Sequence, residues 1–255
     1  MIDSHAHLQD EKYENVEEVV NNAKLEGIDK IICASSSVNA SKRAVEIANK
    51  FENVYATIGI HPEEAGEWNE DTKELFKELA KNNKVKAIGE IGLDYHYEFF
   101  PRETQKQVFI EQIKFANELN LPIVIHSREA SGDMLEIIRE YKDMLVNKTT
   151  IHCYNMGVGI LKEIVSYGFN ISLGGAITFK NARGLLDVVR ECPIENLMLE
   201  TDAPYMSPEP FRGKLNEPAK VKYVAQKIAE LKNISLEEVE RITTQNALKF
   251  FRIGN

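Results

Sequence analysis

The chain has 255 residues, of which 43% are hydrophobic and 28% are charged, and its formal net charge is −9. This composition excludes an intrinsically disordered chain, and no apolar run approaches the roughly 20 residues that a membrane-spanning helix needs. The negative charge also argues against an extended surface that coats nucleic acid, because such surfaces neutralise phosphates with clustered Lys and Arg.

Eight short runs rich in apolar and β-branched residues recur along the chain and are typical of buried strands. They are residues 1–5, 30–34, 54–60, 85–91, 122–126, 149–152, 169–173 and 197–200. Longer segments with helical spacing lie between them, for example residues 16–23 and 108–116. This alternation predicts an α/β fold, a (β/α)8 barrel of parallel strands in a single domain over residues 1–255, with an open doubly wound sheet as the alternative.

The last segment, residues 217–252, is predicted to form two helices. Ser235 followed by Glu238 three residues later is a capping-box pattern, which indicates where the second helix begins.

The location is predicted from the first residues and from the cysteines. The first ten residues contain no basic segment followed by a long apolar run, so no secretion or transit signal is recognised and a cytoplasmic location is expected. Cys33, Cys153 and Cys192 are odd in number and widely separated, which predicts reduced packing residues rather than disulfides or a thiolate zinc site.

Six side chains that commonly bind metals belong to, or directly follow, five of the predicted strands. His5 and His7 come from the first strand, Glu90 from the fourth and His126 from the fifth. His152 comes from the sixth strand and Asp202 follows the eighth. Because the C-terminal strand ends of a (β/α)8 barrel meet at one mouth, we expect all six to gather there.

The two histidines of the His5-Ala-His7 segment point to the same face of an extended strand, so both can reach one metal ion. Nitrogen ligands mixed with carboxylates can hold two divalent ions about 3.5–4 Å apart if one carboxylate bridges them, and Glu90 is the candidate bridge. Each residue alone has a structural alternative: a hydrogen-bonded buried histidine, an ion-paired Glu90 or a helix-capping Asp202. Their co-location favours the metal centre, because buried charges are costly unless they are paired or bind metal.

Seven stretches together resemble the TatD-like metal-dependent deoxyribonucleases of the amidohydrolase superfamily, and they extend from end to end of the chain. They are residues 2–8 (IDSHAHL), 59–62 (GIHP), 89–95 (GEIGLDY), 122–128 (PIVIHSR), 151–153 (IHC), 199–205 (LETDAPY) and 212–214 (RGK) with 216–218 (NEP). Two departures concern loops: residues 153–157 read CYNMG where the family usually has Cys-Phe-Ser-Gly, and His96 stands where an aromatic residue is more usual.

The resemblance implies one metal ion held by His5, His7, Glu90 and Asp202, and a second held by Glu90, His126 and His152. It implies a deoxyribonuclease of the 3′–5′ exonuclease type that cleaves phosphodiester bonds with a metal-activated water. The cofactors would be two divalent cations, with Mg, Mn and Zn as the candidates. Asp202 is the candidate general base, and Glu90 is the second catalytic residue through its bridging position.

Three residues are candidates for binding the substrate. His61 follows the third predicted strand and faces the same mouth, where it could contact the phosphate or support a metal ligand, while Arg128 and Arg212 could clamp phosphate oxygens. A turn-stabilising role for His61 and solvated surface charge for the arginines are the alternatives. Three aromatic residues near the fourth strand could either stack on a base or pack the loop: Tyr95, Phe99 and Phe100.

Two other functions remain open from the sequence. The same centre could hydrolyse esters or amides, for example as a D-aminoacyl-tRNA deacylase, and a non-catalytic metal-binding protein could keep the barrel. The expected substrate partner is a DNA end, with no membrane and no obligate protein partner, in a monomer or small homo-oligomer.

Overall fold

The structure is a computed structural model that describes residues 1–97 and 99–254; the predicted domain of residues 1–255 also includes residues 98 and 255, which lie outside the described part. In this described part of the chain, eight parallel strands form one sheet in chain order, as a (β/α)8 TIM barrel requires. The strands are β1 (Ile2–Ala6), β2 (Lys30–Cys33), β3 (Val54–Ile58), β4 (Val85–Asp94), β5 (Ile123–Arg128), β6 (Thr149–Ile151), β7 (Asn170–Leu173) and β8 (Leu197–Leu199). The predicted fold class is therefore confirmed.

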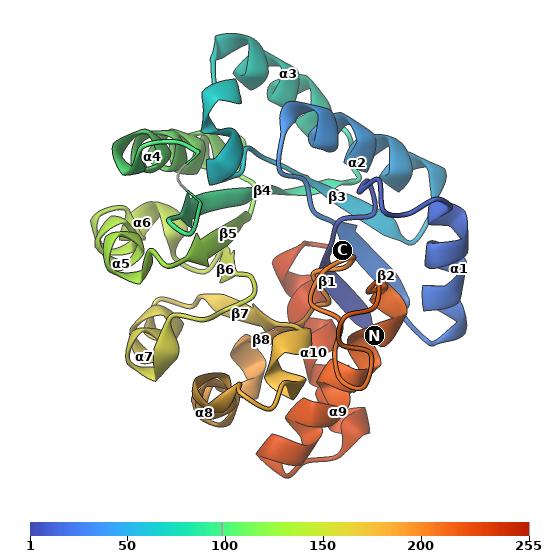
Figure 1. The fold of residues 1–255 in the computed structure, drawn as a ribbon. Coiled ribbons are helices and arrows are strands. Elements are labelled where there is room, and N and C mark those ends of the chain that lie inside the picture. The colour runs from blue at the N-terminus through green and yellow to red at the C-terminus, as the bar shows by residue number, and fades with distance from the viewer. Residues whose placement is uncertain (98, 255) are drawn as a thin grey trace.

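Helices surround the strands as an outer layer (Figure 1). They are α1 (Val16–Leu25), α2 (Val38–Lys50), α3 (Glu70–Ala80), α4 (Arg102–Glu118), α5 (Ser131–Glu140), α6 (Lys142–Leu145), α7 (Gly157–Ser166), α8 (Arg183–Glu191), α9 (Val221–Lys232) and α10 (Leu236–Phe250). Ser235 accepts a hydrogen bond from the backbone N–H of Glu238 at 3.1 Å, so the second C-terminal helix begins where its capping pattern predicts. No helix in the described part combines the length and apolar character needed to cross a membrane.

The C-terminal helix covers one end of the barrel. Phe250, Phe251 and Ile253 pack in one buried cluster with side chains from five strands, among them Ile2 of β1 and Met198 of β8. Ile2 is the first residue of β1, so this cluster lies at the N-terminal end of that strand. This packing leaves the opposite end, where the C-terminal strand ends meet, for the candidate site.

The seam between β1 and β8 is closed by residues beside the two short strands. Ala6 and Ala203 form a parallel bridge, the backbone N–H of His7 donates to the Ala203 carbonyl at 2.6 Å, and the N–H of Asp202 donates to the His5 carbonyl at 2.9 Å. The hydrogen bonds that close the barrel therefore also fix the backbone of three candidate metal ligands.

β4 and β5 run two or more residues beyond the ends that the sequence pattern predicts. β4 continues to Asp94, three residues beyond its predicted end, and β5 continues to Arg128. Glu90 lies inside β4, at a shift in the β4 to β5 register between Ile88 and Ile91. The polar residues at these ends hid the continuation, because apolar periodicity cannot register strand residues that face a polar site.

All three cysteines are free; Cys33 and Cys192 are buried, and Cys153 is partly buried.

Candidate metal centre

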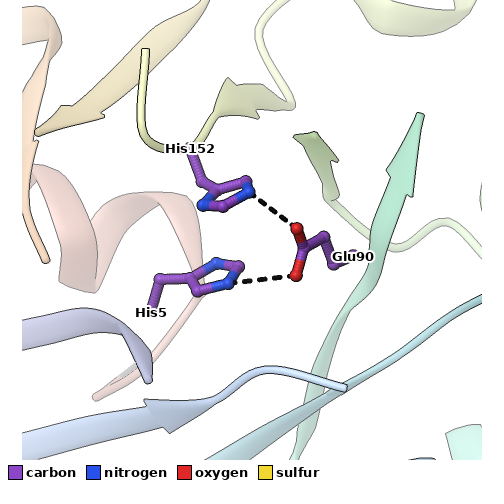
Figure 2. Close-up of side chains that lie close together, drawn as sticks. All are labelled: His5, Glu90 and His152. Atoms are coloured by element: carbon purple, nitrogen blue, oxygen red, sulfur yellow. Dashed lines mark ion pairs between the residues drawn. The ribbon is translucent and has the colours of Figure 1, made fainter. Parts of the chain in front are cut away.

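Glu90 lies at the centre of the group, and its two carboxylate oxygens face different sets of histidines. Oε1 is 2.7 Å from His126 Nδ1 and 2.8 Å from His152 Nε2. Oε2 is 3.3 Å from His5 Nε2 and 3.7 Å from His7 Nε2. Figure 2 shows this division for His5 and His152, which approach opposite oxygens of the carboxylate. One side chain therefore contacts two groups of ligand-type atoms.

Asp202 completes the group on the β1 side. Its Oδ1 lies 3.3 Å from His7 Nε2 and 3.9 Å from His5 Nε2. Asp202 has a φ of +55° and Cys153, directly after His152, has a φ of +44°, both in the left-handed region that L residues rarely adopt. Such strain is typical of functional sites, where the surrounding structure holds the residue in place.

The structure brings all six predicted ligands together and adds His61. Ligand atoms lie within 4.8 Å of one another in three sets: His5, Glu90 and His152; His5, His7 and Asp202; and His61, Glu90 and His126. From the sequence, His61 was expected either to contact the phosphate or to support a ligand, and its Nε2 is 3.6 Å from Glu90 Oε1. This contact joins β4 to the residues beyond β3, and nothing in the local sequence signals it.

Burial and neighbouring charges act on the acidic groups in opposite directions. Burial disfavours the charged form of Glu90, but His152, His126 and His5 outweigh it and hold the pKa of Glu90 well below its ordinary value. Burial also opposes ionisation of Asp202, and the hydrogen bond from His7 prevails and lowers its pKa. Both carboxylates are therefore ionised near neutral pH, as metal ligands must be.

The same competition between burial and neighbouring charges shifts the pKa values of the histidines in different directions. Burial, assisted by His152, lowers the pKa of His5 to about 4, and burial with His126 lowers that of His61 to about 3. Burial acts the same way on His7, but Asp202 and Glu90 outweigh it and raise its pKa to about 9.

Several buried nitrogen atoms in the group have no hydrogen-bond partner among the described residues. They are both ring nitrogens of His5 and the Nδ1 atom of His152. Their rings are stacked, with centroids 3.9 Å apart and planes within 8°. Unsatisfied buried polar atoms are rare in folded proteins and call for a missing partner such as an ion. Orphaned imidazole nitrogens beside ionised carboxylates fit divalent metal ions with mixed nitrogen and oxygen ligands.

Two further carboxylates, those of Asp94 and Glu200, lie beside the histidines of this group. Asp94 Oδ2 is 2.9 Å from His126 Nε2, and its Oδ1 accepts the backbone N–H of His96 at 2.8 Å, so Asp94 joins a candidate ligand to the segment that follows β4. Glu200 accepts the N–H of Cys153 at 2.6 Å, and its Oε2 lies 3.8 Å from His152 Nδ1. Carboxylates in such positions orient metal-binding imidazoles.

A cavity of about 1140 Å³ opens over the group. His7, Glu90, His126, His152, Asp202 and His61 line it, and so do three cationic side chains: Lys12, Arg43 and Arg128. Lys12 and Arg43 were not among the residues predicted from the sequence. Acidic side chains of Asp10, Glu11 and Glu63 share the wall.

Arg212 lies at a different place. Its guanidinium is 4.2 Å from the ring centroid of Phe179. Phe179 lines a smaller hollow of about 310 Å³, which shares Asn155 with the large cavity. Among the described residues, Arg212 is not part of the large cavity's lining.

Known proteins resemble this chain over nearly its whole length. A family model described as TatD related DNase matches residues 2–252. The Bacillus subtilis (strain 168) protein named uncharacterized metal-dependent hydrolase YabD is 43% identical over 255 residues, which is 100% of both chains. The Escherichia coli (strain K12) protein named uncharacterized metal-dependent hydrolase YcfH is 34% identical, over 99% of this chain and 96% of its own. The crystal structure of YJJV, a TatD homologue from Escherichia coli K12, matches with a TM-score of 0.92 at 27% identity, covering 99% of this chain and 98% of that one.

Proposed function

This chain belongs to the TatD related DNase family, and on that premise we propose that it is a deoxyribonuclease that hydrolyses phosphodiester bonds at DNA ends with two divalent cations. Metal-dependent hydrolysis is the activity that the family and the names of its relatives give the chain. The observation that carries the finer proposal is the position of Glu90, whose two oxygens face two separate sets of histidines. A carboxylate so placed can bridge two ions.

The proposed ligands follow from this division. One ion would be held by His5, His7, Glu90 and Asp202, and the other by Glu90, His126 and His152. Two divalent cations bound together would lower the pKa of a water molecule and polarise the phosphoryl oxygen that it attacks. Mg, Mn and Zn all accept such mixed nitrogen and oxygen ligands.

Asp202 is the proposed general base. Its side chain is 16% exposed and lines the cavity, whereas the side chain of Glu90 is 5% exposed. Asp202 accepts one proton from the attacking water as the water oxygen bonds to phosphorus and the bond from phosphorus to the leaving sugar oxygen breaks. The proton then passes to the leaving oxygen, so that Asp202 returns to its ionised form.

His61 is proposed to donate a hydrogen bond rather than to bind metal. Its Nδ1 accepts the backbone N–H of Glu63 at 3.2 Å, so in the neutral ring the proton resides on Nε2. Nε2 faces Glu90 at 3.6 Å in the wall of the cavity. From there it can donate to a phosphate oxygen of the substrate.

The charges of the molecule favour cleavage at a strand end. The chain is acidic overall, yet Lys12, Arg43 and Arg128 are gathered at one cavity. An extended duplex needs a long basic surface, whereas a single terminal phosphodiester needs only a local one. Arg128 is the residue proposed to bind the phosphate, and Arg212 is proposed to contact a neighbouring part of the substrate at the smaller hollow.

The test is nucleotide release from single-stranded DNA by EDTA-treated protein, before and after Mg, Mn or Zn is restored. A 3′–5′ exonuclease releases a labelled mononucleotide at once from 3′-labelled DNA and shortens 5′-labelled DNA stepwise. Glu90→Gln and His126→Ala should lose the activity, while Glu74→Gln, which changes an exposed glutamate on α3, should keep it.

Two outcomes would contradict the proposal. Absence of cleavage with every metal, in protein shown to be folded by circular dichroism, would exclude the nuclease. Metal-dependent hydrolysis of carboxyl esters or of D-aminoacyl-tRNA, without DNA cleavage, would instead assign the same residues to the hydrolysis of carboxyl esters.

A further inference from the structure

Two exposed aromatic side chains lie beside the cavity of the candidate metal centre. Tyr97 and Phe99 belong to the connection from β4 to α4, and they are 46% and 64% exposed. Their ring centroids are 5.6 Å apart, and the rings are tilted by 41°. Adjacent apolar rings left in water forgo hydrophobic stabilisation, and such patches typically mark binding sites.

The connection that carries these rings is anchored by two other aromatic residues. Tyr95 donates its hydroxyl to Asp133 at 2.7 Å, and the guanidinium of Arg102 lies 4.3 Å from its ring centroid. Phe100 packs so closely on Gly66 that an added Cβ there would lie 3.0 Å from the ring. Tyr95 and Phe100 are therefore held in place by packing and hydrogen bonding, whereas the rings of Tyr97 and Phe99 remain exposed.

Tyr97 is also fixed from its sides. The guanidinium of Arg128 lies 5.2 Å from its ring centroid, and both residues line the large cavity. His96 meets the ring edge-on at a centroid distance of 4.6 Å, and its Nδ1 lies 2.7 Å from Glu129 Oε1. A ring held in this way loses little conformational entropy when a flat ligand covers its free surface.

These side chains match the parts of one nucleotide. An aromatic ring stacks on any base, because every base has a π-face, and a neighbouring guanidinium pairs with phosphate. Arg128 is two residues from His126 on β5, so the phosphate site and the ring lie along the same wall of the cavity.

We propose that Tyr97, with Phe99 beside it, is a stacking platform for an unpaired base adjacent to the phosphodiester that is cleaved. The proposal rests on the proposed function, because it assigns the substrate class of the same site. It makes single-stranded or frayed ends the preferred substrate, because a paired base cannot leave its partner and cover the ring without a cost in unstacking. It also predicts little preference among the four bases.

Binding to terminal bases tests the platform without catalysis. The probe is a single-stranded oligonucleotide with 2-aminopurine as its 3′-terminal base, mixed with full-length protein in EDTA, and its partner is the same oligonucleotide with an abasic terminus. Wild-type protein should quench the 2-aminopurine fluorescence and bind the base-bearing end about 5- to 150-fold more tightly than the abasic end, the range for one stacked base.

Variants separate stacking from general effects. Tyr97→Ala should lose most of this ratio, Tyr97→Phe should keep it, and Phe99→Ala should reduce it. Leu25→Ala removes another exposed apolar side chain, 85% exposed at the end of α1, and should leave the ratio unchanged. With metal restored, kcat/KM for base-bearing over abasic ends should follow the same order.

The failures of the two proposals are distinguishable. Equal ratios for wild-type protein and Tyr97→Ala, or no preference for the base-bearing end in wild-type protein, would overturn the platform even if DNA is cleaved. A ratio that depends on Tyr97, in protein that cleaves no DNA with any metal, would support the platform and overturn the nuclease.

Discussion

Asp3 offers a sensitive test of how barrel closure supports the site. Its side chain is fully buried next to the seam, where Oδ1 accepts the backbone N–H groups of Thr201 at 3.0 Å and of His5 at 3.3 Å. Its Oδ2 accepts the hydroxyl of Thr201 at 2.5 Å. One carboxyl group therefore positions the backbone at His5 and one residue before Asp202.

Asp3→Ala should lower the free energy of unfolding by about 2–6 kcal/mol. Two buried backbone N–H groups lose their acceptor, and each unsatisfied donor costs about 1–3 kcal/mol. The hydroxyl of Thr201 can rotate to another acceptor and is left out of this sum. Asp3→Asn keeps an oxygen for both N–H groups and should cost about 1 kcal/mol.

The assay is urea unfolding of EDTA-treated protein, followed by far-UV circular dichroism, with the slope m checked for constancy. A value for Asp3→Ala within about 1 kcal/mol of wild type, or equal losses for Asp3→Ala and Asp3→Asn, would refute the reasoning, since the acceptor oxygen would then contribute nothing.

Three further predictions follow from single contacts. Glu200→Gln should weaken Mn²⁺ binding, measured by calorimetry, by about 10- to 100-fold, because the carboxylate beside His152 Nδ1 orients that ring. Gly92→Ala should lower the free energy of unfolding by about 3 kcal/mol or more, because φ is +149° and the new Cβ would lie 2.0 Å from the carbonyl oxygen of His126. Hydrogen bonds from Arg139 on α5 and from Tyr167 lower the pKa of Glu163 to about 2. Its stabilising effect should therefore be complete above about pH 4.5 and be lost as the pH falls toward 2, so that the unfolding curves of wild type and Glu163→Gln, separate at pH 7, converge in acid.

Each of these three has its own control. Asp187→Asn changes an exposed carboxylate on α8 and should leave Mn²⁺ affinity unchanged. An equal loss of Mn²⁺ affinity in Asp187→Asn and Glu200→Gln would contradict the role given to Glu200. A Cβ added at Gly159 on α7 meets nothing within 4 Å, so Gly159→Ala should raise the free energy of unfolding by up to about 1 kcal/mol. Similar effects of Gly159→Ala and Gly92→Ala would contradict the strain predicted at Gly92. Arg139→Gln should give the same acid dependence as Glu163→Gln, because it removes the other partner of the pair.

The predicted strands agree with the structure because parallel barrel strands are covered on both faces and so form continuous apolar runs. Each of the eight begins within one residue of its prediction. The strand ends were harder to predict, since Asp94 and Arg128 continue β4 and β5 with polar side chains that serve the site.

The six candidate ligands were recognisable because each follows or interrupts an apolar strand, where a charged or ionisable side chain needs a reason. The contacts that these side chains make with one another were harder to predict from the sequence. The contact of His61 with Glu90 depends on the exact stagger of β3 and β4, including a register shift between Ala56 and Thr57, which apolar periodicity does not encode. Tyr97 was missed for a related reason, because the sequence cannot distinguish an aromatic residue that packs a loop from one that the loop exposes.

The most direct test of the metal centre is anomalous X-ray scattering from crystals of the metal-stripped protein soaked in Mn²⁺. We expect two anomalous peaks about 3.5–4 Å apart, with the carboxylate of Glu90 between them. His5, His7 and Asp202 should lie at one peak, and His126 and His152 at the other. A single peak, or two peaks that do not share Glu90, would contradict the two-metal centre on which the proposed hydrolysis depends.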